Sequence, residues 1–160
     1  MMVTTDRARR LVEAVMLEDR LLVAVSARDE EIEQPAPDDL YSVGTAVRIL
    51  RMAKGTQDSM RLWVQGIQRV RIARYTQTDP YLSASIEPLE ETAERGLEME
   101  ALHRNVSQQF TELTEDSSTV AQPIRSIVSG MTDSSALADI VAANLGLSVP
   151  DRQELLEILD

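Results

Sequence analysis

The chain has 160 residues, which is enough for one domain or two small ones, and its hydrophobic fraction of 43% is enough to bury a core. It contains no cysteine, which excludes a disulfide framework and a zinc–thiolate site, and no apolar run approaches the ~20 residues that span a membrane. The N-terminus lacks the apolar core of a signal peptide, so the sequence predicts a cytoplasmic protein that makes no membrane contact.

The net charge of −11 is unevenly distributed along the chain. Residues 1–80 hold 12 basic and 12 acidic residues, whereas residues 81–160 hold 4 basic and 15 acidic residues. A nucleic-acid-binding protein needs a basic surface to replace the counterions along the phosphates. The sequence therefore predicts no nucleic-acid partner, although a local basic patch in the first half stays possible.

Residues 6–17 are predicted to form the first helix. Thr5 can cap the N-terminus of this helix, and Asp6 suits the positive end of its dipole. The apolar residues that recur at helical spacing, and so define the buried side, are Ala8, Leu11, Val12 and Val15.

The following segments are predicted to be strands, because the spacing between apolar residues along the chain becomes shorter than in the first helix. A segment rich in acidic residues and containing two prolines, residues 28–39, is predicted to be a solvated loop. Residues 54–58 contain Gly55 and are predicted to be the turn of a hairpin. The predicted strands are residues 21–25, which we expect to be buried, and residues 45–52, 60–66, 67–75 and 81–86.

The second half changes to a helical period. We expect a change of subdomain near residues 89–98, where both the charge and the period shift, which divides the chain into residues 1–90 and 91–160. Strands followed by helices indicate an α+β fold. Four apolar stripes predict four helices: Met99, Leu102, Val106, Phe110 and Leu113; Ile124, Ile127 and Val128; Leu137, Ile140, Val141 and Leu145; Leu155, Ile158 and Leu159.

Catalytic and cofactor-binding patterns are missing. The only lysine, Lys54, lacks the upstream glycines of a phosphate-binding loop and lies in a predicted turn, so it is a poor base for a Ser–Lys dyad. The only histidine, His103, fits a partly buried helix position better than a catalytic base. No acidic spacing resembles a calcium-binding loop. The sequence therefore predicts no enzyme activity, no cofactor and no metal site.

Several segments of the chain follow the sequence patterns of one known family, in the same order. The segment Pro37–Val47 is similar to the family pattern P-x-D-L-Y-x-V-G-T, and Val64–Ile72 is similar to V-x-G-x-x-R-x-R-I. Pro80-Tyr81-Leu82 with Pro88-Leu89 resembles the P-Y-L and P-L that follow. Residues 137–145 and 153–157 resemble the closing helices. Through these segments the chain resembles the N-terminal domain of the ATP-dependent protease Lon, and their order and spacing extend the resemblance from about Val3 to Asp160.

The resemblance implies a small PUA-like β-barrel with one helix, followed by an α-helical bundle. It also implies a domain that binds unfolded or degron-bearing protein substrates and supports assembly of a hexamer. ATP, Mg²⁺ and the protease site would belong to downstream ATPase and protease domains, so this segment itself would have no cofactor.

The chain departs from the family in two places. It begins after the position of the family's first strand, which predicts an unpaired sheet edge, and Asp160 stands where the family continues into a long helix. These departures favour an excised domain over a stand-alone relative of unassigned binding role. An RNA-binding PUA-like module is a further alternative that the acidic balance disfavours.

Substrate contacts are expected on the charged side of the first helix and at accessible apolar side chains. Trp63 lies on the polar side of its predicted strand, where it either packs under another segment or is exposed to a partner. The candidate contact residues are Asp6, Arg7, Arg10, Leu40, Tyr41 and Trp63.

Overall fold

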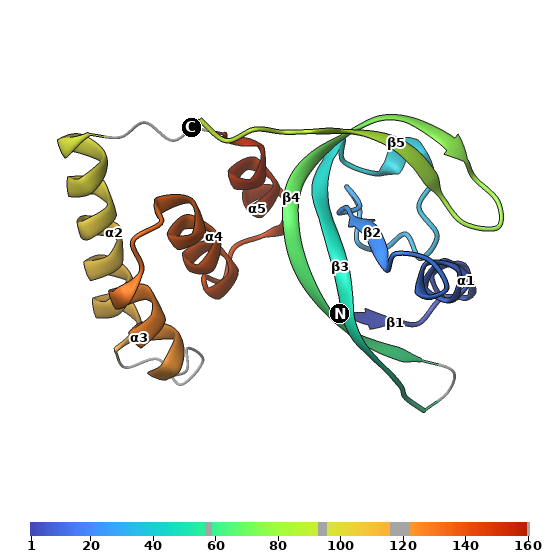
Figure 1. The fold of residues 1–160 in the computed structure, drawn as a ribbon, viewed down its shortest axis with the longest axis horizontal. Helices are drawn as coiled ribbons and strands as arrows, with labels where there is room; N and C mark the ends of the chain where they lie inside the picture. Colours follow the sequence, from blue (N-terminus) through green and yellow to red (C-terminus); the bar gives the residue numbers. More distant parts are fainter. Residues whose placement is uncertain (57–58, 93–95, 116–121, 160) are drawn as a thin grey trace. The chain divides into compact units, whose positions relative to one another are not determined.

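The computed structural model describes residues 1–56, 59–92, 96–115 and 122–159. The chain divides into two compact units, Met1–Glu90 and Glu91–Asp160 (Figure 1). The first unit contains the strands and one helix, and the second contains helices, so the fold is mixed α/β with an antiparallel sheet.

An antiparallel sheet forms the frame of the first unit. Its strand order is β1-β4-β3-β2, and β5 also pairs with β4. In the described residues the path ends at β1 and β2, so the sheet is not closed into a barrel. The elements of this unit are β1 (Met2–Val3), α1 (Asp6–Met16), β2 (Leu21–Ala24), a 3₁₀ turn (Pro37–Asp39), β3 (Val43–Lys54), β4 (Met60–Gln77) and β5 (Ser83–Pro88).

One long strand, β4, organises the sheet. It pairs with β3 along most of its length, with β1 at Met60 and Arg61, and with β5 from Val70 to Gln77. The sequence predicted an unpaired edge. The structure shows that β1 covers part of it, and that residues 63–68 of β4 have a strand partner only in β3 within the described part of the chain.

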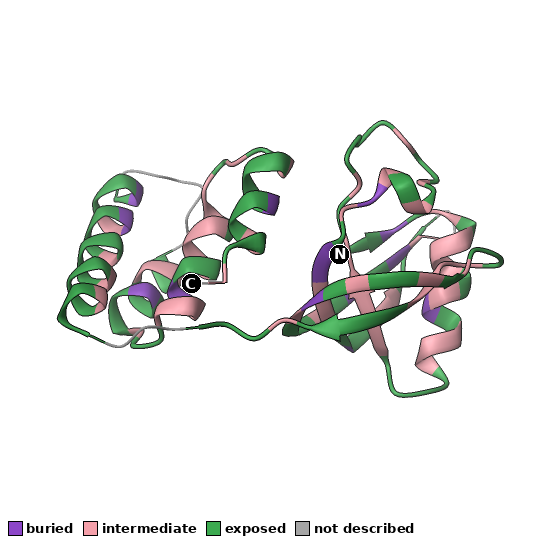
Figure 2. Cartoon of the chain, turned by 90° about the horizontal axis from the view of Figure 1, so that it is seen from above, coloured by how far each residue is buried: buried purple, intermediate pink, exposed green. Residues whose placement is uncertain are grey.

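The first core lies between the sheet and α1. As predicted, Thr5 caps α1 by accepting a hydrogen bond from the Ala8 backbone N–H at 3.3 Å. Residues of β3 and β4 such as Ile49 and Leu62 face this helix, while their neighbours face away, because successive side chains point to opposite sides of a sheet. The buried members of this core are Val3, Val12, Ile49, Met60 and Leu62 (Figure 2).

Three predictions about the strands are corrected. The segments predicted as separate strands before and after Gly66 form one strand, because pairing with β3 continues past Gly66, which pairs with Val47, after a register shift beside it. β5 begins at Ser83, two residues later than predicted, and β2 is half-buried and not fully buried. The predicted turn at residues 54–58 includes Gln57 and Asp58, which lie outside the described residues, while Gly55 and Ser59 are joined by a backbone hydrogen bond of 2.8 Å.

Four α-helices make up the described part of the second unit. Their second core consists of Phe110, Val128 and Leu137, with flanking apolar residues from α3 and α4. Asp133 caps α4 and Ser148 caps α5, each by accepting a hydrogen bond from a backbone N–H of the first turn. The helices are α2 (Leu97–Thr114), α3 (Gln122–Gly130), α4 (Ser134–Asn144) and α5 (Val149–Glu157).

The helix predicted from the first of the four apolar stripes is present as α2, but most of its apolar stripe is exposed. Phe110 is buried, but Leu102 and Val106 are exposed, and Leu113 is 75% exposed. The side of α2 that faces the unit is largely polar, because hydroxyl and imidazole groups there hydrogen bond to backbone carbonyls. In α5 the buried residue is Gln153, whereas Leu155 and Ile158 of the predicted stripe are more than 40% exposed.

Candidate functional site

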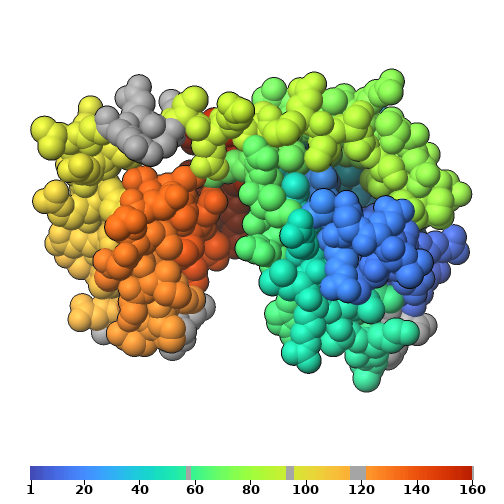
Figure 3. Space-filling model, in the orientation of Figure 1, coloured from blue at the N-terminus to red at the C-terminus, as the bar shows by residue number. Residues whose placement is uncertain are grey.

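The charged side of α1 borders a small hollow at the end of the β3–β4 hairpin. Asp6 and Arg10 are both exposed, and both line this hollow of about 300 Å³. Asp6 forms an ion pair with Arg9 one turn along the helix. In the space-filling view α1 lies at the surface beside the hairpin (Figure 3). The remaining lining residues are Arg9, Glu13, Lys54, Gly55, Ser59 and Met60.

Arg7 differs from its neighbours on α1. Its guanidinium donates to the backbone carbonyl of Pro35 at 3.1 Å and to that of Thr78 at 3.0 Å. These two carbonyls belong to different loops, so Arg7 fastens both to the helix. The sequence suggested Arg7 as a substrate contact, but these bonds give it a structural role and leave Asp6 and Arg10 as the accessible pair.

Trp63 lies on the outer side of the hairpin. It is 43% exposed, and the guanidinium of Arg51, its cross-strand partner, lies 5.2 Å from the ring centroid. Of the two arrangements that the sequence left open, the structure shows the exposed one. A guanidinium over an indole face is a favourable cation–π arrangement.

The other two apolar candidates are less accessible than Trp63. Leu40 is 8% exposed and belongs to the core, so it offers little surface to a partner. Tyr41 is half-buried, and the guanidinium of Arg28 lies 4.6 Å from its ring centroid. The structure therefore does not bring the six candidate residues into one site: it groups Asp6 with Arg10 and places Trp63 on the hairpin.

Sequence reasoning missed the excess of positive charge on the two strands around Trp63. β3 and β4 together carry seven basic residues and no acidic residue, although the whole chain has a net charge of −11. Averaging the charge over residues 1–80 hid this pattern. Reading the charge strand by strand would have revealed it, because residues 45–52 and 60–66 were both predicted as strands.

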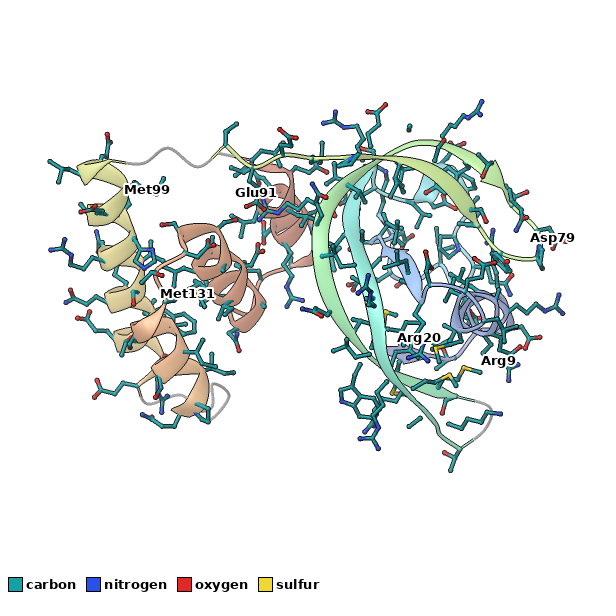
Figure 4. The ribbon with its side chains drawn as sticks, in the orientation of Figure 1. Arg9, Arg20, Asp79, Glu91, Met99 and Met131 are labelled. Atoms are coloured by element: carbon teal, nitrogen blue, oxygen red, sulfur yellow. The ribbon has the colours of Figure 1, made fainter. Side chains whose placement is uncertain are left out.

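A wider cleft of about 1100 Å³ opens in the helical unit, between α2 and the connection from α3 to α4. Met99 and Met131 lie on its two sides (Figure 4). His103 lines the cleft, where Nε2 donates to the carbonyl oxygen of Met131 at 2.9 Å and Nδ1 lies 3.0 Å from Oγ of Ser134. Both ring nitrogens are engaged within the fold, which agrees with the structural role predicted for this histidine.

Burial raises the pKa of the Tyr75 hydroxyl above its ordinary value of 10.0. No group of three or more His, Asp or Glu side chains in the described residues could hold a metal ion. No helix in the same part of the chain is long and apolar enough to cross a membrane.

Solved structures share this two-unit fold. The N-terminal domain of the Mycobacterium avium complex Lon protease matches with a TM-score of 0.77 at 24% identity, covering all of this chain and 83% of that one. A Lon N-terminal domain protein from Xanthomonas campestris matches with a TM-score of 0.65 at 18% identity, covering all of this chain and 80% of that one. The fold is therefore that of Lon N-terminal domains.

Sequence comparisons identify the family. The model of the ATP-dependent protease La (LON) substrate-binding domain matches residues 1–160. The Lon protease of Desulfovibrio desulfuricans is 33% identical over 156 residues, which cover 97% of this chain and 18% of that protein. The Lon protease of Trichlorobacter lovleyi is 35% identical over 94% of this chain and 19% of its own length. The chain belongs to the Lon substrate-binding domain family and spans about a fifth of the length of these relatives.

Proposed function

We propose that this domain binds unfolded or degron-bearing proteins for a Lon-type ATP-dependent protease in the bacterial cytoplasm. The observation that carries the proposal is the match of the Lon substrate-binding model to the whole of residues 1–160. In this proposal the domain also supports assembly of a hexamer. ATP and Mg²⁺ act in other domains of the protease, and the sheet of the first unit corresponds to a PUA-like barrel.

The accessible charged groups of α1 support a binding role. A receptor for unfolded chains must accept many sequences, so it needs accessible polar and apolar groups and not one closely shaped pocket. Asp6 and Arg10 line an open hollow and supply one charge of each sign. Trp63 supplies an exposed aromatic ring on the same unit.

The test compares one protein in two conformations. Reduced and alkylated lysozyme stays unfolded, whereas native lysozyme has a similar composition and is folded. We expect the domain to bind the unfolded form in a fluorescence anisotropy titration and not the native form, and to hydrolyse no ATP. Equal binding of both forms would show that the domain responds to charge and not to unfolding, and would refute the proposal.

A further inference from the structure

The outer side of the β3–β4 hairpin combines positive charge with exposed apolar groups. Met60, Leu62 and Val64 pack toward the core, so the residues that alternate with them face outward. On β3, Ile49 is buried while its two neighbours are exposed. We define the outer hairpin face by its exposed side chains: Arg48, Leu50, Arg51, Arg61, Trp63 and Ile67.

The arginines of this face carry uncompensated charge. In the described part of the chain no carboxylate lies within 4.0 Å of Arg48, Arg51 or Arg61. Arg51 contacts the ring of Trp63, and neither β3 nor β4 contains Asp or Glu. The fold therefore presents guanidinium groups whose hydrogen-bond donors are available to an outside acceptor. Guanidinium binds carboxylate through paired, charge-assisted hydrogen bonds.

The apolar side chains of the outer hairpin face lie next to its arginines in the pairing of β3 with β4. Arg51 lies directly opposite Trp63, and Leu50 precedes Arg51 at a register shift of the ladder. Leu50 is 56% exposed and Ile67 is 52% exposed. A partner that carried carboxylates alone would leave these side chains in water, whereas one with interspersed apolar residues would cover them.

We propose that the outer hairpin face binds acidic segments of unfolded polypeptides in which Asp or Glu alternates with apolar residues. This inference rests on the proposed function and adds to it the class of segment recognised. In an extended segment, residues two apart are about 6.6 Å apart, which is also the spacing of Arg61 and Trp63 along β4. Carboxylates would meet the arginines, and apolar side chains would cover Leu50, Trp63 and Ile67.

Protein fits this face better than nucleic acid does. The face has one aromatic ring for base stacking but two exposed aliphatic side chains, which contribute little to binding a phosphate backbone. The net charge of −11 opposes a long polyanion but interferes less with a short acidic segment. The family is also one of substrate-binding domains of a protease.

The experiment titrates the domain into a short fluorescent peptide in which Glu alternates with Leu and Phe. A matched peptide with Lys in place of Glu is the first control. We expect the Glu peptide to bind, with an affinity that falls as salt rises, and the Lys peptide not to bind at this face. The charge-reversal variant R48E/R61E should weaken binding of the Glu peptide about tenfold or more.

A second variant separates this face from the overall charge. R104E/R152E reverses two exposed arginines of the helical unit and changes the net charge by the same amount. It should bind the Glu peptide nearly as well as the wild type, apart from a small loss through long-range repulsion. Equal losses in the two variants would overturn the assignment. The W63S variant should also weaken binding of the Glu peptide while leaving the far-ultraviolet circular dichroism unchanged.

The remaining outcomes distinguish this inference from the proposed function. If unfolded lysozyme binds but the Glu peptide does not, the assignment of acidic segments to the outer hairpin face is wrong, whereas the proposed function stands. If neither unfolded lysozyme nor the Glu peptide binds, both the proposed function and this inference are refuted. If a generic single-stranded RNA binds the wild type but not R48E/R61E, and the Glu peptide does not bind, the outer hairpin face binds nucleic acid and the inference is overturned. If R48E/R61E abolishes self-association in sedimentation without affecting peptide binding, the face joins copies of the chain, which also overturns the inference.

Discussion

Nε2 of His103 lies 2.9 Å from the carbonyl oxygen of Met131 and joins the middle of α2 to the connection between α3 and α4. The carbonyl can only accept a hydrogen bond, so Nε2 must carry the hydrogen. Ser107 acts in the same way one turn later, because its Oγ donates to the carbonyl of Val128 at 3.3 Å. Polar side chains of α2 therefore satisfy carbonyls near the end of α3.

Replacing His103 with Ala should destabilise the helical unit. The change removes two partly buried hydrogen bonds and leaves the Met131 carbonyl without a protein partner, at a cost of about 1–2 kcal/mol in the free energy of unfolding. Urea denaturation followed by circular dichroism measures this loss. Glu100→Ala, an exposed change one turn earlier on α2, serves as the control and should have little effect. An unchanged midpoint for His103→Ala would show that water replaces these bonds at no cost.

Arg7 and the pair Asp6 and Arg10 should behave differently when replaced. Arg7→Ala removes bonds to the carbonyls of Pro35 and Thr78 and should lower the unfolding free energy by about 1–2 kcal/mol. The double variant D6A/R10A should lose at most about 1 kcal/mol, because exposed charged groups contribute little.

The same double variant tests the hollow beside α1 as a binding surface. D6A/R10A should bind unfolded lysozyme several times more weakly than the wild type if the hollow contacts substrate. Unchanged affinity together with unchanged stability would mean that these charges only keep the helix soluble.

Replacing Gly44 with Ala should destabilise the sheet. A Cβ atom at Gly44 would lie 2.5 Å from the backbone oxygen of Ala24, which cannot move without breaking the pairing of β2 with β3. Overpacking of this kind costs about 1–3 kcal/mol. Gly66→Ala is the matched control, because its Cβ would make an ordinary contact of 3.6 Å with Thr45. Thermal denaturation of both variants gives the comparison, and equal melting temperatures would refute the steric argument.

Tyr75 should contribute a pH-dependent part of the stability. Burial raises the pKa of its hydroxyl in the folded state, so the neutral form is favoured there more than in the unfolded chain. This contribution is complete below the ordinary pKa of 10.0 and is lost as the pH rises through the higher folded pKa. Tyr75→Phe should therefore lose less stability than the wild type as the pH rises above about 10.

At neutral pH the Tyr75→Phe change should be nearly neutral or slightly stabilising. The hydroxyl oxygen is buried and has no hydrogen-bond partner in the described residues, so phenylalanine removes an unsatisfied group. Denaturant unfolding at neutral and alkaline pH tests both statements. A parallel loss of stability in wild type and variant would exclude Tyr75 as the source.

The sequence predicted the structure best where a single local interaction determines it. Thr5 was identified as a cap, and its side chain accepts a backbone hydrogen bond in the structure. Capping is a local interaction between residues two or three apart, so it can be read from neighbours in the chain. The alternation of a strand is local as well: Trp63, which the sequence placed on the polar side of its strand, is exposed, whereas its neighbour Leu62 is buried.

The prediction failed where polar side chains face inward. The apolar stripe at helical spacing included Leu113, which is exposed, whereas the neighbouring Thr114 is buried and its hydroxyl donates to the Phe110 carbonyl at 2.7 Å. A hydroxyl that donates a hydrogen bond to a carbonyl of its own helix can be buried at little cost in free energy. A hydropathy pattern does not show such bonds. The role of Arg7 was hidden because its partners, Pro35 and Thr78, are distant in sequence.

The 18 residues of β4 are bonded to three different strands, which constrains how this protein can change in length. Inserting or deleting one residue near Leu62 would turn every later side chain of β4 to the opposite side of the sheet and would misalign β3 and β5 together. The acidic loop at residues 28–39 has one 3₁₀ turn and few pairing interactions with the strands. Length differences among natural variants should therefore collect in that loop, while β4 changes only by substitution.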